Sequence, residues 1–306
     1  MVIPTMNRPS ALRECIQSVL DGEMQPEQII VSDQSKSNST RLMVEGHEWS
    51  TGGSSVNVKY LHLQRPNASA ARNAGVRATR TELVAFIDDD CIAHRGWLAA
   101  LVGEYIDSKN MESISSVTGS VLPAFSSRGS VATSSRSSPE RRVYRASEGG
   151  IDRGEWAPWD TGSGGNLLCP RRTLLDVGGF DTRLGPGTPA RAAEDIDLLY
   201  RLARAGAIIY QPHAVVYHAA KSRRDHVASR YPYGKGMGSM LVKHLATEDS
   251  RTARQLLMLY IRHQGANAFR HGAWGPLESF LVLSGAVGAL VSTLLKAKGS
   301  RFKVQC

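Results

Sequence analysis

The chain has 306 residues, of which 42% are hydrophobic and 21% are charged, as is typical of a soluble globular protein with one large or two modest domains. Its formal net charge of +9 favours an anionic partner such as a nucleotide, a nucleic acid or a membrane surface, although a basic surface without a special partner fits equally well. The four cysteines are scattered without a CxxC pair, which excludes the disulfide framework of a small secreted domain and predicts free thiols in the cytoplasm.

The first part of the chain alternates strand and helix patterns. Strand-like runs lie at residues 1–5, 28–35, 58–63 and 82–90, and helix-like runs lie at residues 8–20, 67–79 and 96–106. This alternation predicts an α/β fold with a mainly parallel sheet, in which ligands bind at the carboxyl ends of the strands. Polar residues follow several strand-like runs and are expected to meet at that edge.

The second part of the chain begins with a change in composition. Serine, arginine and glycine dominate residues 124–150, which predicts a mobile loop. Residues 193–206 then have the apolar spacing of a helix, with Glu194 and Asp195 in its first turn, and residues 207–212 and 214–218 resemble short strands. Residues 183–191, which are rich in glycine and proline, precede that helix and predict a lid.

From about residue 222 onward the pattern is mainly helical. The longest apolar run, residues 280–295, is shorter than the roughly 20 residues of a membrane-spanning helix and contains two glycines, so it predicts a buried or interfacial helix. Basic residues follow it at positions 296, 298, 301 and 303, so contact with an anionic membrane is one interpretation and an ordinary C-terminal helix is the other.

Three adjacent carboxylates, Asp88, Asp89 and Asp90, follow the apolar run at residues 83–87. Three like charges at the end of a buried strand cost free energy, and a bound Mg²⁺ or Mn²⁺ ion would offset that cost because these ions prefer oxygen ligands. Strand alternation would place Asp88 and Asp90 on one side and Asp89 on the other. The alternative is a polar strand end that caps the next helix.

Seven separated blocks occur in one order: "VIPTMNRP", "VSDQS", "NASAARNAG", "FIDDDC…GW", "GGNLLCPR…DVGGFD", "EDIDLLYRL" and "VVYH". Together they resemble the family 2 glycosyltransferases of the GT-A fold. The resemblance implies a GT-A type nucleotide-binding sandwich over residues 1–220, followed by a helical C-terminal region, residues 221–306, that shapes the acceptor site or contacts a membrane surface. It also implies transfer of a sugar from a nucleotide-sugar donor to an acceptor hydroxyl, with inversion at the anomeric carbon.

The resemblance also implies roles for individual residues. Asp195 is expected to be the catalytic base, and Asp90 with His218 is expected to hold Mn²⁺ or Mg²⁺. Asp33 would accept a hydrogen bond from a uracil-type base, which favours a UDP-sugar, and two glycines would let the backbone approach the donor sugar. The complete set expected to contact the donor is Thr5, Arg8, Asp33, Arg72, Asp88, Asp89, Gly164, Gly165 and Glu194.

Two rival functions fit part of the pattern. A nucleotidyltransferase acting on a sugar phosphate would also bind a nucleotide and Mg²⁺, but "PTMNRPS" has no glycine for the expected phosphate loop. A non-catalytic nucleic-acid-binding protein would use the net charge, but aromatic residues are only 7% of the chain and do not cluster on the predicted strands. The acceptor stays open among a saccharide, a lipid-linked sugar, a peptide and a small natural product.

Overall fold

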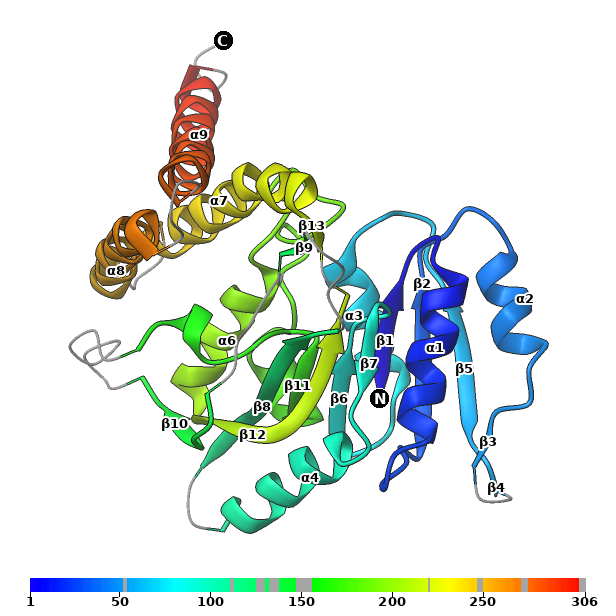
Figure 1. Ribbon diagram of the computed structural model, residues 1–306. Helices are drawn as coiled ribbons and strands as arrows, with labels where there is room; N and C mark the ends of the chain where they lie inside the picture. Colours follow the sequence, from blue (N-terminus) through cyan, green and yellow to red (C-terminus); the bar gives the residue numbers. More distant parts are fainter. Residues whose placement is uncertain are drawn as a thin grey trace.

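The computed structural model describes residues 1–302 apart from 52–53, 111–112, 125–129, 132–137, 147–155, 220, 247–249 and 271–274. The predicted loop at residues 124–150 therefore lies mostly outside the described residues. In the described part, a mixed sheet of nine strands forms the centre of the molecule, with the order β10-β12-β8-β11-β6-β1-β2-β5 and β7 paired to β12 (Figure 1). The strands of this sheet are β1 Val2–Thr5, β2 Gln28–Asp33, β5 Asn57–His62, β6 Leu83–Ile87, β7 Cys91–Ala93, β8 Ile114–Pro123, β10 Arg142–Tyr144, β11 Asn166–Pro170 and β12 Ala207–His218.

The amino-terminal half of the sheet is parallel, as predicted. Strand β1 pairs in parallel with β2 and β6, and β2 pairs in parallel with β5. Strand β11 is antiparallel to both β6 and β8, while β12 is parallel to β8 and antiparallel to β10 and β7. The carboxyl ends of β1, β2 and β6 therefore lie at one edge of the sheet, and β12 brings its own end to the short strand β7.

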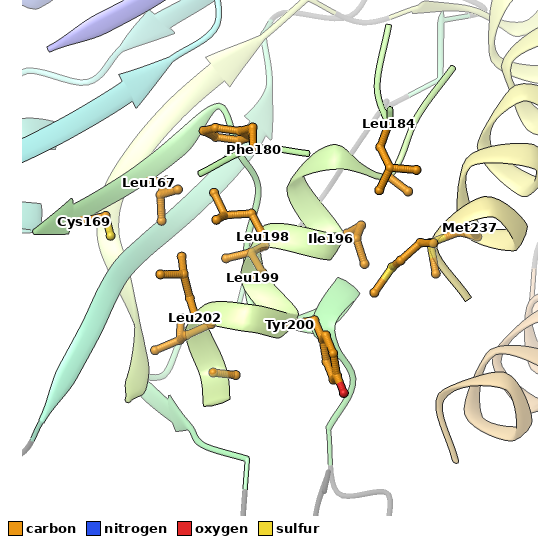
Figure 2. Close-up of a cluster of buried hydrophobic side chains, with 14 of the residues drawn as sticks. Leu167, Cys169, Phe180, Leu184, Ile196, Leu198, Leu199, Tyr200, Leu202 and Met237 are labelled. Carbon is orange, nitrogen blue, oxygen red and sulfur yellow. The ribbon is translucent and has the colours of Figure 1, made fainter. Parts of the chain in front are cut away.

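Helices cover both faces of the sheet because neighbouring strand residues point to opposite sides. Ile3 and Ile87 pack with α1 Pro9–Leu20 and α4 Trp97–Ser108 on one face, while Val2 and Phe86 pack with α3 Ala68–Ala78 and α6 Glu194–Ala205 on the other. Figure 2 shows the core around α6. The shorter elements are α2 Ser39–Glu45, α5 Arg171–Asp176, the 3₁₀ helix η1 Pro158–Asp160, and the two-residue strands β3 Ser50–Thr51, β4 Ser54–Ser55, β9 Ser130–Val131 and β13 Lys221–Ser222.

The carboxyl-terminal part is helical, with α7 Arg223–Leu245, α8 Ser250–Arg270 and α9 Gly275–Phe302 (Figure 1). Helices α7 and α9 cross closely because glycines face the other backbone: a Cβ on Gly234 would overlap Val282, and one on Gly285 would overlap the backbone of Tyr231. The glycine-rich segment at residues 230–238 is thus the interior of a helix and its contact with α9.

Candidate active site

The three carboxylates after β6 lie beside the end of β1. The Thr5 hydroxyl donates a hydrogen bond of 2.6 Å to Asp89 Oδ2, and Arg8 Nη2 lies 2.9 Å from Asp89 Oδ1. Arg8 also donates through Nη1 to Asp90. Burial raises the pKa of Asp89 to about 6, although the Thr5 hydrogen bond and the Arg8 charge oppose this rise. Strand pairing thus brings Thr5 and Arg8, which were expected to contact the nucleotide-sugar donor, close to the carboxylates.

A second arginine, Arg72 of α3, reaches the same carboxylates from the other side. Its Nη2 lies 2.7 Å from Asp88 Oδ1 and its Nη1 lies 3.1 Å from Glu194 Oε1. Burial lowers the pKa of Arg72, but the charges of Asp88 and Glu194 outweigh burial and hold it above its usual value. Two arginines of the chain therefore already offset the repulsion within the triplet, so the adjacency of the acids does not by itself require a metal ion.

Glu194 and Asp195 begin α6. Asp195 Oδ1 accepts a hydrogen bond of 2.8 Å from the backbone N–H of Ile196, and its Oδ2 accepts one of 3.3 Å from the N–H of Gly164. Burial, followed by the charge of Asp195, raises the pKa of Glu194 to about 7, while Arg72 opposes the rise. Ala193, the residue before the helix, has a left-handed φ of 72°, a strained conformation of the kind found at functional sites.

The two predicted glycines lie against carboxylates of the chain. A Cβ on Gly165 would overlap the carboxylate of Asp88, and a Cβ on Gly164 would come within 2.8 Å of the Asp195 Cβ. The absence of a side chain at these two glycines therefore lets the side chains of Asp88 and Asp195 lie close to the backbone. Contact with a donor sugar stays a prediction for Gly165, which lines the neighbouring cavity.

A cavity of about 740 Å³ joins these groups. Ten of the predicted site residues line it: Thr5, Arg8, Arg72, Asp88, Asp89, Asp90, Gly165, Glu194, Asp195 and His218. Asp33 does not line it. The carboxylate of Asp33 is fully buried and accepts hydrogen bonds of 2.8 Å from Tyr60 Oη and 2.9 Å from the Ser35 N–H, whereas the adjacent Gln34 does line the cavity. Base recognition by Asp33 stays a prediction.

Asp90, Cys91 and His218 could hold a metal ion, because one ligand atom from each lies within 4.8 Å of the others. The pairing of β12 with β7 places His218 opposite Cys91, and His218 Nε2 lies 3.4 Å from Asp90 Oδ1. Burial raises the pKa of the Cys91 thiol. Hard ions such as Mn²⁺ and Mg²⁺ prefer oxygen and nitrogen ligands to sulfur, which favours Asp90 and His218 over Cys91 as ligands. A carboxylate with an imidazole fits Mn²⁺, which accepts both ligand types.

The predicted lid at residues 183–191 lies over one side of the cavity. Pro186, Gly187 and Arg191 line it, and the Pro186 carbonyl accepts a hydrogen bond of 3.0 Å from the Ala68 N–H at the start of α3. Gly187 has a φ of 86°, which a residue with a side chain rarely adopts. Movement of this segment stays a prediction.

The sequence patterns missed two parts of the site. The first is Trp159 of η1, which lines the cavity and has no local motif, whereas Arg230 and Tyr260, which also line it, lie in the helical region that was expected to shape the acceptor site. The other is Asp197, a buried residue of α6 that meets Lys243 Nζ at 2.7 Å and His244 Nε2 at 2.8 Å and so joins α7 to α6. The spacing "EDID" could have drawn attention to it.

Comparison with known proteins agrees with this architecture. Residues 1–145 match the family described as Glycosyl transferase family 2. The chain is 29% identical over 254 residues to a pre-mycofactocin glycosyltransferase of Mycobacterium tuberculosis, covering 80% of the chain and 47% of that protein. It is 24% identical over 302 residues to a glucosyl-dolichyl phosphate glucuronosyltransferase of Haloferax volcanii, covering 93% of the chain and 91% of that protein. The chain thus spans about half the length of the mycobacterial relative.

Solved structures share the fold at low sequence identity. Residues 1–349 of Staphylococcus aureus TarS superpose with a TM-score of 0.59 and 15% identity, covering 94% of this chain and 79% of that one. The mannosyltransferase PcManGT of Pyrobaculum calidifontis, in complex with GDP-Man and Mn²⁺, gives a TM-score of 0.54 and 18% identity, covering 99% of this chain and 79% of that one. With the carboxylates at the β6 edge and at the start of α6 lining one cavity, the chain has the GT-A fold of these solved glycosyltransferases, and its residues 1–145 are similar to glycosyltransferase family 2.

Proposed function

We propose that the protein transfers a sugar from a nucleotide diphosphate donor, a UDP-sugar, to an acceptor hydroxyl with inversion at the anomeric carbon. The observation that carries the proposal is the single cavity shared by Asp88, Asp89 and Asp90 at one end and Asp195 at the other. TarS, which shares the fold, has been solved with UDP-GlcNAc, and this supports a nucleotide-sugar donor.

A divalent ion, Mn²⁺ or Mg²⁺, would be held by Asp90 and His218. When bound, such an ion stabilises the negative charge of the departing diphosphate. Arg8 donates a hydrogen bond to Asp90, forms an ion pair with Asp89 and lines the cavity. Its guanidinium would therefore also be placed to bind the donor phosphates, which suits its planar set of donors.

Asp195 acts as the base that takes the proton of the attacking hydroxyl. The N–H groups of Ile196 and Gly164 donate hydrogen bonds to its carboxylate and fix its position at the start of α6. Glu194 and Asp88 bind opposite ends of the Arg72 guanidinium, so these three side chains position one another between the donor end and the base. The protein otherwise contributes by holding donor and acceptor in line.

The acceptor class is suggested by two relatives. The Haloferax protein is named for a glucosyl-dolichyl phosphate, and a Campylobacter jejuni relative, 28% identical over 102 residues and covering 33% of the chain and 32% of that protein, is named for an undecaprenol-linked glycan. These two names favour a lipid-linked saccharide as the acceptor of this protein, whereas the mycobacterial relative is named for pre-mycofactocin.

The decisive variant is Asp195→Asn. It keeps the size of the side chain but removes the base, so we expect transfer to fall at least about a hundredfold while UDP binding by calorimetry is unchanged. Asp176→Asn, at an exposed position of α5, is the matched control. Near-normal transfer by the Asp195 variant would remove Asp195 from this role. Release of pyrophosphate in place of UDP would instead favour a nucleotidyltransferase, and UDP binding without any effect of Mn²⁺ would reject the metal assignment.

Helix α9 supports a further proposal, contact of this cytoplasmic enzyme with an anionic membrane surface. Its stretch Gly275–Ser292 is long and apolar enough to span a membrane, with a mean hydropathy of 1.4, and a third of it is buried in the protein. Phe280, Val287 and Val291 are exposed on this helix. Basic residues at positions 296, 298 and 301 follow on the same helix, so their charge complements anionic lipids.

A further inference from the structure

One face of α8 points into the active-site cavity. Tyr260, His263, Gln264 and Asn267 all line it, and their spacing of three, four and seven residues places them on a single face of the helix. A helix face turned toward the interior of a protein is ordinarily apolar. Here it carries a phenol, an imidazole and two amides, and the same cavity contains Asp195.

Trp159 of η1 completes this wall. Its ring lies 5.5 Å from that of Tyr260 at an interplanar angle of 65°, and 5.7 Å from that of His263 at 50°. Three rings from two separate elements therefore meet at one corner of the cavity. Asp160, the neighbour of Trp159, lines the same cavity, so η1 connects the aromatic corner with the carboxylate end.

The two amides on α8 have no side-chain partner within the described part of the chain. Gln264 is only 8% exposed, and among the residues that the structure describes neither Gln264 nor Asn267 has a side-chain hydrogen bond. Burying an amide costs free energy unless it is hydrogen-bonded. Because both side chains line the cavity and Asn267 is partly exposed, water or the polar groups of a bound molecule can satisfy them.

A sugar ring matches this wall chemically. The C–H groups of a pyranose pack against an aromatic ring, while its hydroxyls both donate and accept hydrogen bonds, as amides do. A polyprenyl chain would instead need an apolar surface, which the Gln264 and Asn267 side chains do not provide. Apolar and aromatic lining with a few well-placed polar groups is the usual composition of a small-molecule site.

We propose that Trp159, Tyr260, Gln264 and Asn267 form the acceptor subsite, and that this subsite binds the terminal hexopyranose ring of a saccharide acceptor. The inference rests on the proposed glycosyltransferase function and adds the acceptor class and the residues that select it. One hydroxyl of the bound ring would lie toward Asp195, and the remainder of the acceptor would extend out of the cavity.

The test is binding of simple glycosides, measured by saturation-transfer NMR on the full chain with UDP and Mn²⁺ present. The probes are the methyl α- and β-pyranosides of glucose, galactose, mannose and N-acetylglucosamine at millimolar concentrations, with cyclohexanol as an apolar control. We expect at least one glycoside to receive saturation at its ring protons and cyclohexanol to receive none. Gln264→Leu should weaken that binding about tenfold, the usual effect of losing one hydrogen bond in a site, and Tyr260→Phe, which keeps the ring, should weaken it less.

Gln17→Leu, the same change at an exposed position of α1, is the matched control and should bind like the wild type. The proposal is overturned if no glycoside binds, if cyclohexanol binds equally well, or if Gln264→Leu and Asn267→Leu both bind like the wild type. Calorimetry with UDP and slow hydrolysis of a UDP-sugar are measured on the same samples. Loss of these two signals in the wild type would reject the proposed function, whereas loss of glycoside binding alone would reject only the acceptor subsite.

Discussion

Asp197 is the residue whose replacement we expect to destabilise the protein most clearly. It is fully buried in α6, two residues after the proposed base, and its carboxylate meets Arg201 at 2.7 Å, Lys243 at 2.7 Å and His244 at 2.8 Å. Lys243 also meets Asp181 at 2.8 Å. This buried ionic cluster holds α7, which contributes Arg230 to the cavity lining, against the helix that carries Asp195.

The size of the effect follows from the pKa of Asp197. Burial alone raises this pKa, but the hydrogen bond from His244 and the charges of Arg201 and Lys243 outweigh burial and lower it from 3.8 to about 2. At 1.36 kcal/mol per pKa unit, the difference corresponds to about 2 kcal/mol of stability at neutral pH. Asp197→Asn also leaves the basic side chains without that partner, so a loss of about 2 to 5 kcal/mol is expected.

The assay is urea unfolding followed by tryptophan fluorescence. Because the folded pKa is depressed, the contribution of Asp197 is complete above about pH 4 and is lost as the pH falls toward 2. The difference between wild type and Asp197→Asn should therefore be constant from pH 7 to about pH 4 and shrink below it. Asp176→Asn, which loses an exposed pair of 3.6 Å with Arg172, should change stability by less than about 0.5 kcal/mol. Equal effects of the two variants at pH 7 would refute the reasoning.

Three further outcomes are expected. Gly165→Ala should displace the Asp88 carboxylate and weaken UDP binding, whereas Gly103→Ala, at a glycine with open space around it, should leave UDP binding unchanged. Calorimetry with UDP measures the difference, and equal UDP affinity of the two variants would contradict the packing argument. Arg72→Met should leave Asp88 and Glu194 unpaired and destabilise the protein by about 3 to 5 kcal/mol. Arg77→Met, at an exposed position of the same helix, should leave the stability unchanged, and urea unfolding measures both variants. Phe280→Asp should reduce the fraction of protein that sediments with vesicles containing phosphatidylglycerol, whereas Leu42→Asp, at an exposed position of α2, should not. Equal sedimentation of the two variants would argue against a membrane role for α9.

The sequence alone determined the elements of the sheet and the edge where the site lies. The periodicity of residues 1–108 predicted β1, β2, β5 and β6 and the helices α1, α3 and α4, but not α2, because each predicted element buries an apolar face whose spacing is local. The same reasoning placed Thr5, Arg8 and the triplet together, because parallel strands share the edge at which they end. It could not anticipate that Arg8 and Arg72 pair with the triplet, since arginine side chains are long and their partners are distant in the chain.

The other features of the site depend on the tertiary structure. Asp33 follows a strand as predicted, but Tyr60 and Ser35 bind its carboxylate outside the cavity, and only the packing of β5 beside β2 determines this. Likewise Trp159 and the polar face of α8 have no local signature, and the spacing "EDID" marks Asp197 without indicating its partners, because these roles arise where elements separated by tens of residues meet. The periodicity of a sequence predicts which face of a helix or strand is buried. Which residues contact that face depends on the packing of the whole protein.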